Sequence, residues 1–190
     1  MHKNFLKHTT TFLNDAGYPT IAAQLVESSD VYQLTISLPQ ALPLQIVGFF
    51  LSELLRLVQE DEETSGSGLT TNANDPDFLQ LFIRFPFDFE ESSAADLARL
   101  MLMINWSTPV GSFGINETQK IVYYRQVFEW RNGQEDVGLV LDAVSAMEFY
   151  ANLRHNRIRS IASGELTMAG LLREMEEKGT RKEEFPGYDL

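Results

Sequence analysis

The stretch from Phe78 to Phe89, FLQLFIRFPFDF, has the clearest alternation of apolar and polar positions in the chain. In an extended strand successive side chains point to opposite faces, so Gln80, Arg84 and Asp88 share one face. A helix would scatter the remaining apolar residues around its circumference, whereas a strand gathers them on the other face. The pattern therefore predicts a central strand with one face covered by helices. The residues predicted on that covered face are Leu79, Leu81, Ile83, Phe85, Phe87 and Phe89.

Helical and alternating patterns on both sides of this strand predict the other elements. The predicted elements are a helix over 3–16, strands over 20–27 and 31–38, a helix over 93–105, a hairpin with strands 110–115 and 120–130, a long helix from about 134 to 161, and a shorter helix over 165–178. Ser93 and Asp96 have the spacing of a capping box at the start of the helix over 93–105, with Asp in the usual Glu position.

Two stretches between the early strands and the central strand need separate treatment. Residues 45–58 place their polar side chains at helical spacing, but their first half, Ile46 to Phe50, is typical of a strand. Residues 60–77 consist mostly of acidic residues, Gly, Ser and Asn, which predicts a mobile loop. We therefore expect one α+β domain over 1–163, with an antiparallel sheet of about five to six strands packed by helices. A C-terminal helix and a flexible tail follow over 164–190.

The charge balance narrows the classes of partner. The chain has 15 Lys and Arg against 27 Asp and Glu, a net charge of −12. A nucleic-acid-binding or anionic-membrane-binding protein needs an excess of basic residues, so both classes are disfavoured. The acidic balance predicts either simple solubility or a preference for basic partners.

Other sequence features bear on where the protein functions. The chain has no cysteine, so disulfides and thiolate chemistry are excluded. Its amino terminus lacks the apolar core of a signal peptide, and no apolar run reaches the length of a membrane span. We therefore expect a cytoplasmic protein.

Candidate catalytic and metal-binding residues are few. The three histidines are His2, His8 and His155, and we expect each to be an ordinary surface residue, with no catalytic role. The acidic run over 60–63 lacks the spacing of a calcium loop, and Gly66 to Gly68 lacks the Lys and Ser or Thr of a phosphate-binding loop. The sequence predicts no catalytic residue, no metal site and no cofactor.

Two segments are more apolar than a simple amphipathic element. The helix over 93–105 is apolar nearly all round, and strand 120–130 is half apolar on both faces, which indicates either double burial or a surface left for a partner. The candidate protein-interaction residues are Leu100, Met103, Phe113, Tyr123, Tyr124 and Trp130. Arg154, Arg157 and Arg159 form a candidate basic patch. These arginines either balance the helix dipole on a solvated face or contact an acidic segment, such as the chain's own loop over 60–77.

Four stretches carry a resemblance to a known family: FLQLFIRFPF at 78–87, LARLMLMIN at 97–105, VGSFGI at 110–115 and IVYYRQ at 121–126. Together they resemble the YbjN-like bacterial family and its cyanobacterial relatives, within the type III secretion chaperone-like fold. The resemblance implies that a strand runs from 45 to about 55 and that the protein is a small, acidic homodimer. It also implies client binding over hydrophobic patches or a regulatory role. The helix after 163 and the loop over 60–77 extend beyond the minimal pattern.

Two functional hypotheses follow. The first is a non-enzymatic protein-binding module, chaperone-like or regulatory, which is homodimeric and has an unidentified client. The second is a small-ligand-binding protein or an enzyme with a pocket on the sheet, which would need polar groups that converge on it. The residues available for such a pocket are Arg84, Tyr124, Arg125 and Gln126.

Overall fold

The computed structural model describes residues 2–24, 32–39, 44–50, 77–130 and 136–178. Their elements, in chain order, are α1 (His2–Asp15), β1 (Thr20–Gln24), β2 (Tyr32–Ser37), β3 (Gln45–Phe50), β4 (Asp77–Asp88), the 3-10 turn η1 (Glu91–Ser93), α3 (Ala94–Ser107), β5 (Ser112–Asn116), β6 (Ile121–Trp130), α4 (Val137–Ala162) and α5 (Met168–Lys178). The strands form one antiparallel six-stranded sheet in the order β1-β2-β3-β4-β6-β5. This arrangement confirms the predicted α+β class and places β1 and β5 at the two edges of the sheet.

The chain divides into two compact units that share β4, β6 and α4. Unit 1 comprises residues 1–82 and 126–144, and unit 2 comprises residues 83–125 and 145–190. Each unit therefore contains one edge strand and the helix that precedes it in sequence. The predicted division into 1–163 and 164–190 stays a prediction.

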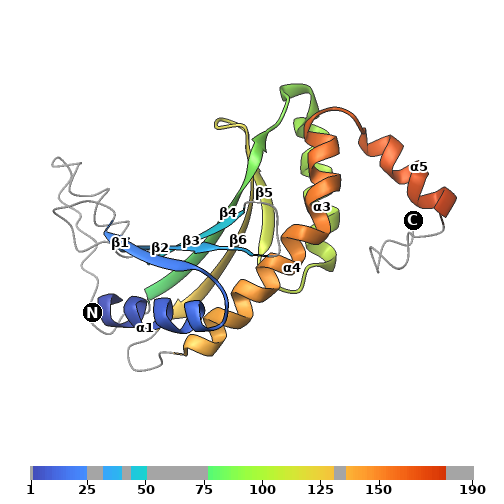
Figure 1. The fold of residues 1–190 in the computed structure, drawn as a ribbon. Helices are drawn as coiled ribbons and strands as arrows, with labels where there is room; N and C mark the ends of the chain where they lie inside the picture. Colours follow the sequence, from blue (N-terminus) through green and yellow to red (C-terminus); the bar gives the residue numbers. More distant parts are fainter. Residues whose placement is uncertain (1, 25–31, 40–43, 51–76, 131–135, 179–190) are drawn as a thin grey trace, which may run out of the picture. The chain divides into compact units, whose positions relative to one another are not determined.

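In unit 1, α1 packs on the sheet beside its edge strand (Figure 1). Strand β2 lies between β1 and β3, with Ile36 opposite both Thr20 and Ile46. The apolar stripe of α1 faces this sheet, and the ring of Phe5 meets that of Phe50 edge-on at a centroid distance of 6.1 Å. Burial of this stripe against the strands explains why the segment forms a helix here.

In unit 2, α3 and α4 overlap in the view of Figure 1, and a hydrogen bond from Arg154 on α4 to Ser107 on α3 joins them. Helix α3 contacts both β5 and α5. Phe113 on β5 pairs with Tyr124 on β6 across the hairpin. Helix α4 ends just before Gly164, whose φ of 73° lies in the left-handed region that favours glycine at a helix end.

The central strand is β4, as its alternation predicts. Leu79, Leu81, Ile83 and Phe85 are fully buried, at 0% exposure. The first part of the ambiguous segment over 45–58 is also a strand, β3, whereas 51–58 lies outside the described residues. Of the loop expected over 60–77, residues 60–76 also lie outside them and Asp77 begins β4, and the tail from 179 lies outside them as well. No helix in the described ranges is long and apolar enough to cross a membrane.

The predicted capping box is wrong. The chain enters α3 through η1, so Ser93 already has helical dihedral angles and its side chain makes no capping hydrogen bond. Asp96 instead accepts a hydrogen bond from the backbone N–H of Met168 through Oδ2, at 2.7 Å. Its carboxylate thereby satisfies one of the unpaired donors at the start of α5 and ties α5 to α3.

Candidate protein interface

Four of the six predicted interaction residues are buried, so the prediction that they lie on the surface is wrong for these four. Leu100 and Tyr124 are 0% exposed, and Met103 and Phe113 are nearly so. The reason is that α3 contacts β5 on one side and α5 on another, so its wide apolar surface is covered twice. Tyr123 is half-buried, and the side chain of Trp130 lies outside what the structure describes.

The buried pair Phe113 and Tyr124 is part of the core of unit 2. Their rings stack with a centroid distance of 4.2 Å and an interplanar angle of 3°. The hydroxyl of Tyr124 donates a hydrogen bond to the carbonyl of Val110. Burial, with a smaller contribution from Tyr150, raises the pKa of Tyr124 above its ordinary value. The phenol is therefore neutral at physiological pH and donates its proton in a hydrogen bond to the backbone carbonyl.

The predicted basic patch is also wrong, because its three arginines have different surroundings. Arg154 is buried at 6% exposure, and its Nη2 donates a hydrogen bond to Oγ of Ser107 on α3 at 3.1 Å. Arg157 is half-buried and lines a groove of about 340 Å³ between α4 and α5. Arg159 is exposed. Only Arg159 is therefore presented to solvent as the prediction requires.

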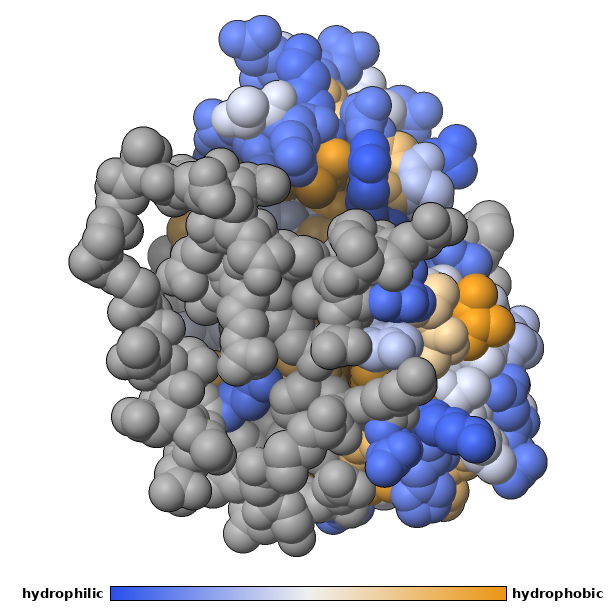
Figure 2. Space-filling view, turned by 90° about the vertical axis from the view of Figure 1, so that its left-hand side faces the viewer, coloured by the Kyte–Doolittle hydropathy of each residue, from blue (hydrophilic) through white to orange (hydrophobic). Residues whose placement is uncertain are grey.

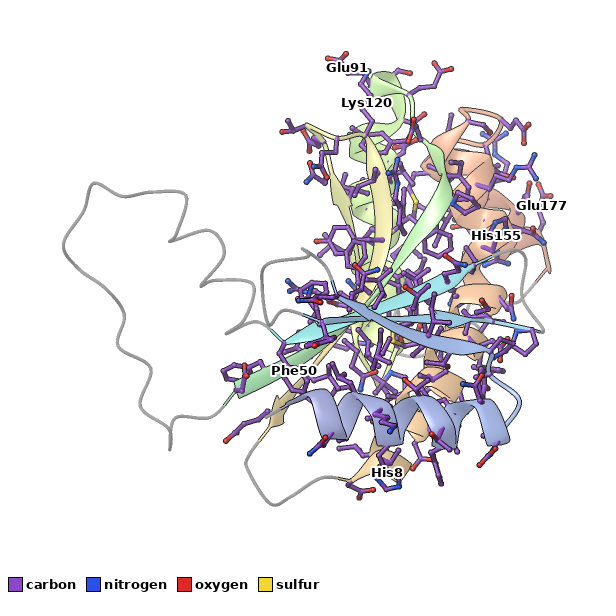
Figure 3. All side chains as sticks on the ribbon, turned by 60° about the vertical axis from the view of Figure 1, so that its left-hand side comes forward. His8, Phe50, Glu91, Lys120, His155 and Glu177 are labelled. Atoms are coloured by element: carbon purple, nitrogen blue, oxygen red, sulfur yellow. The ribbon has the colours of Figure 1, made fainter. Side chains whose placement is uncertain are left out.

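His155 is not the surface residue that we expected. It is 4% exposed, and its ring lies 5.5 Å from that of Phe87 and 5.9 Å from that of Phe85 between centroids. Burial lowers the pKa of His155, a hydrogen bond with Asn156 opposes this effect, and the charge of Arg159 adds to it. The imidazole on α4 (Figure 3) is thus a neutral part of an aromatic cluster in unit 2.

The polar residues suggested for a pocket on the sheet do not converge within unit 2. Arg84 is exposed and forms an ion pair with Asp88 at 3.3 Å, and Arg125 is exposed on β6. Tyr124 is buried as described above. Gln126 is also buried, and it belongs to unit 1. A surface cavity of about 370 Å³ lies at Arg84 and is lined by β4 residues 84–88.

The structure exposes four other large apolar side chains on the two neighbouring helices of unit 2. Leu102 and Trp106 on α3 are 70% and 68% exposed, and Phe149 and Leu153 on α4 are 59% and 52% exposed. Each pair is separated by four residues and so lies on one side of its helix. We call these four residues the apolar helix face.

Both pairs lie opposite the buried side of their helix. On α3 the buried residues include Leu97 and Ile104, which are displaced from Leu102 around the helix axis. The hydrogen bond between Arg154 and Ser107 joins the two helices next to Leu153 and Trp106, the residues just before them. The apolar helix face therefore has one pair of residues on each of two helices that contact each other.

Sequence reasoning missed this face although a signal was present. The buried stripe of α3 contains Leu97, Leu100 and Ile104, and a helix with that stripe inside must present Leu102 and Trp106 outside. The sequence pattern instead predicts Leu100 and Met103, which lie in the core, as the exposed residues of α3.

On one side of the molecule, exposed apolar side chains are scattered (Figure 2). On the side of the molecule in Figure 2, the described surface is mainly hydrophilic, and hydrophobic residues show as small separate patches. Single exposed apolar residues of this kind are ordinary on soluble proteins. The grouping of four on two adjacent helices is what distinguishes the apolar helix face.

In the ranges that the structure describes, no three His, Asp or Glu side chains are grouped so that they could hold a metal ion.

Comparisons of the chain with protein families, with characterised proteins and with solved structures find no match.

Proposed function

We propose that the protein is a non-enzymatic protein-binding module, chaperone-like or regulatory, that functions as a homodimer in the cytoplasm and binds a protein client. The observation that supports this proposal is the apolar helix face. Four large apolar side chains, each more than half exposed, are costly to leave in water and are typical of an interaction site. The resemblance to the YbjN-like family and to secretion chaperones points in the same direction.

The surroundings of Tyr124 and His155 in unit 2 also favour binding over catalysis. A general acid or base must present its proton to a substrate. The hydroxyl of Tyr124 instead donates to a backbone carbonyl, and the ring of His155 is buried against Phe85 and Phe87. Both side chains are part of the core of unit 2.

The proposal is tested by affinity capture from a native cell extract, read by mass spectrometry. We expect a protein to be recovered in stoichiometric amount with the natural chain, and to be lost with the double variant Leu102→Glu, Phe149→Glu. The matched control is Ile21→Glu, because Ile21 on β1 is 63% exposed but lies outside the apolar helix face. Equal recovery with the natural chain and the double variant would count against the proposal.

The homodimer is tested separately by measuring the molecular mass in dilute solution. A particle of twice the chain mass supports the homodimer, and a strictly monomeric particle would contradict it.

A second candidate function, small-ligand binding on the sheet, is favoured by the cavity at Arg84. Its volume of about 370 Å³ is within the usual size range of ligand sites. A metabolite that co-purifies with the natural chain and is lost in Arg84→Ala would support this function.

A further inference from the structure

The exposed side of α3 and α4 in unit 2 differs in charge from the chain as a whole. Every side chain of α3, and of α4 from Ser145 onward, is described. The exposed ones are Ala95, Arg99, Leu102, Trp106, Ser145, Phe149, Leu153, Asn156 and Arg159. None of them is acidic, although the chain carries 27 acidic against 15 basic residues. Within these ranges, the apolar helix face is therefore accompanied by two exposed arginines and no exposed carboxylate.

The composition of this surface indicates the chemistry of its partner. Tryptophan and arginine are the residues most enriched among the energetically important contacts of protein interfaces. Carboxylates are the natural partners of Arg99 and Arg159, because a guanidinium binds a carboxylate through paired hydrogen bonds. A complementary surface thus presents apolar side chains with acidic residues beside them.

The spacing of the apolar residues indicates the shape of the partner. Leu102 and Trp106 form one ridge and Phe149 and Leu153 a second, each with four-residue spacing on neighbouring helices. A third helix can pack its own four-residue ridge against such a pair, as in the binding of an amphipathic helix to a groove.

A second copy of the chain is a poorer match for the same surface. In a symmetric dimer the same patch faces itself across the two-fold axis. Arg99 and Arg159 would then meet another surface that carries arginines and no acid. Charge complementarity therefore favours a different protein.

We propose that the apolar helix face binds an amphipathic helix of another protein, whose apolar side is flanked by Asp or Glu residues. The inference rests on the proposed protein-binding function of the same face and names the class of its partner. It places the homodimer contact elsewhere on the chain.

The test uses two synthetic, fluorescently labelled peptides with leucines at helical spacing, one flanked by glutamates and the other by lysines. Fluorescence anisotropy with the full chain should show the glutamate peptide binding at least about tenfold more tightly. Leu102→Glu should weaken its binding about tenfold or more, because it places a charge in the apolar contact. Arg99→Glu should reverse the preference between the two peptides. Ile21→Glu, the matched control on β1, should leave the affinity unchanged.

Several results would overturn the inference. Equal affinity for the two peptides would do so, as would the same loss with Ile21→Glu as with Leu102→Glu. Because Leu102 is exposed, the variant should fold, and circular dichroism checks this; Leu153→Glu is a second variant of the same face.

The test also separates the inference from the homodimer and from the proposed function. If Leu102→Glu converts a dimer to a monomer, a second copy covers the face, so the inference fails while the homodimer stands. Peptide binding by a strictly monomeric chain supports the inference and removes the homodimer. If a client is captured through the face but the glutamate peptide is not bound, the function stands and the partner class is wrong.

Discussion

Each unit joins a helix to an edge strand of the sheet by the same local arrangement, α1 to β1 in unit 1 and α3 to β5 in unit 2. An asparagine in the last turns of the helix pairs with the backbone of a strand residue through both its side-chain oxygen and its nitrogen. Asn14 does so with Thr20 at 3.0 Å for both hydrogen bonds, and Asn105 with Phe113 at 2.8 and 2.9 Å. The amide thus takes the position that a neighbouring strand would take, which blocks part of an exposed edge.

The two arrangements differ in what surrounds them. Asn14 is exposed, and after Thr20 the side chains of β1 are all exposed. Asn105 is half-buried, and Phe113 stacks on the buried ring of Tyr124. The same asparagine-to-strand arrangement therefore covers an exposed sheet edge in unit 1 and supports the core in unit 2. The cost of breaking it should therefore follow burial rather than hydrogen-bond count.

The glycine between helix and strand gives the largest expected difference in stability between variants of the two units. Gly17 and Gly111 both have positive φ, of 90° and 68°. An alanine Cβ at Gly111 would lie 2.7 Å from the carbonyl oxygen of Arg125, whereas one at Gly17 meets nothing within 4 Å. We expect Gly111→Ala to lower the free energy of unfolding by about 3 kcal/mol or more, and Gly17→Ala by about 1 kcal/mol from backbone strain alone. Urea denaturation of the two variants measures this difference, and equal losses would contradict it.

The asparagines themselves should show the next largest difference. Asn105→Ala leaves the N–H and C=O of Phe113 without their side-chain partner at a half-buried position, which costs about 2 to 3 kcal/mol. Asn14→Ala should cost about 1 kcal/mol, because water reaches the exposed position. Chemical denaturation of both variants tests whether Asn105→Ala loses more unfolding free energy than Asn14→Ala. Asn105→Asp is the matched control: it keeps the acceptor and loses the donor, so an effect as large as that of alanine would show that the donor half dominates.

Much of the fold could be predicted from local pattern. The alternation in β4 and in the hairpin of β5 and β6, and the helical spacing of α1 and α4, each appear within one segment of sequence. The strand at β3 could not be decided in this way, because its apolar residues fit a short strand and a helix equally well. Its pairing with β2, Ile36 opposite Ile46, settles the matter by long-range contact.

The candidate site was less predictable because it depends on which side of a helix is covered. The covering of α3 is fixed by residues distant in sequence: Asp96 bonds to Met168, 72 residues later, and Ser107 to Arg154, 47 residues later. Local spacing does not indicate such distant pairs. It leaves open whether the apolar surface of α3 is buried on two sides or left for a partner, and it predicts Leu100 and Met103 at the surface although both lie in the core. His155 was misplaced for the same reason, since its aromatic neighbours lie on β4.

The hydrogen bond of Asp96 links α3 to α5, in addition to the link between α3 and β5 through Asn105. A variant at Asp96 tests how much this second link contributes to stability. Asp96→Ala removes a charged acceptor from the first N–H of α5 and should cost about 1.5 kcal/mol. Hydrogen exchange should show faster exchange of the α5 amides and little change in β5. Asp142→Ala, at an exposed position on α4, is the matched control. Unchanged protection of α5 would show that the apolar contacts of Met168 and Leu171 hold the helix without this bond.

The histidines give the smallest expected effect and a pH dependence that distinguishes the two units. His8 lies on the outer side of α1, away from the strands of unit 1, whereas His155 is buried in unit 2 (Figure 3). Because the folded state lowers the pKa of His155, the unfolded chain binds the proton more readily below about pH 6.5. Stability from the neutral imidazole is therefore complete above that pH and falls as the pH drops through the lowered folded value.

Each unit of pH across that window should cost the natural chain at most about 1.4 kcal/mol through this group. The measurement is urea denaturation at pH 7.5 and 5.5 for the natural chain and for His155→Phe, which keeps a ring against Phe85 and Phe87. The variant should lose less stability on acidification, because it has no proton to take up at this position. His8→Gln, at an exposed position on α1, is the matched control variant. If His155→Phe and the natural chain lose the same stability, the acid sensitivity lies in the carboxylates, and burial of His155 contributes packing alone.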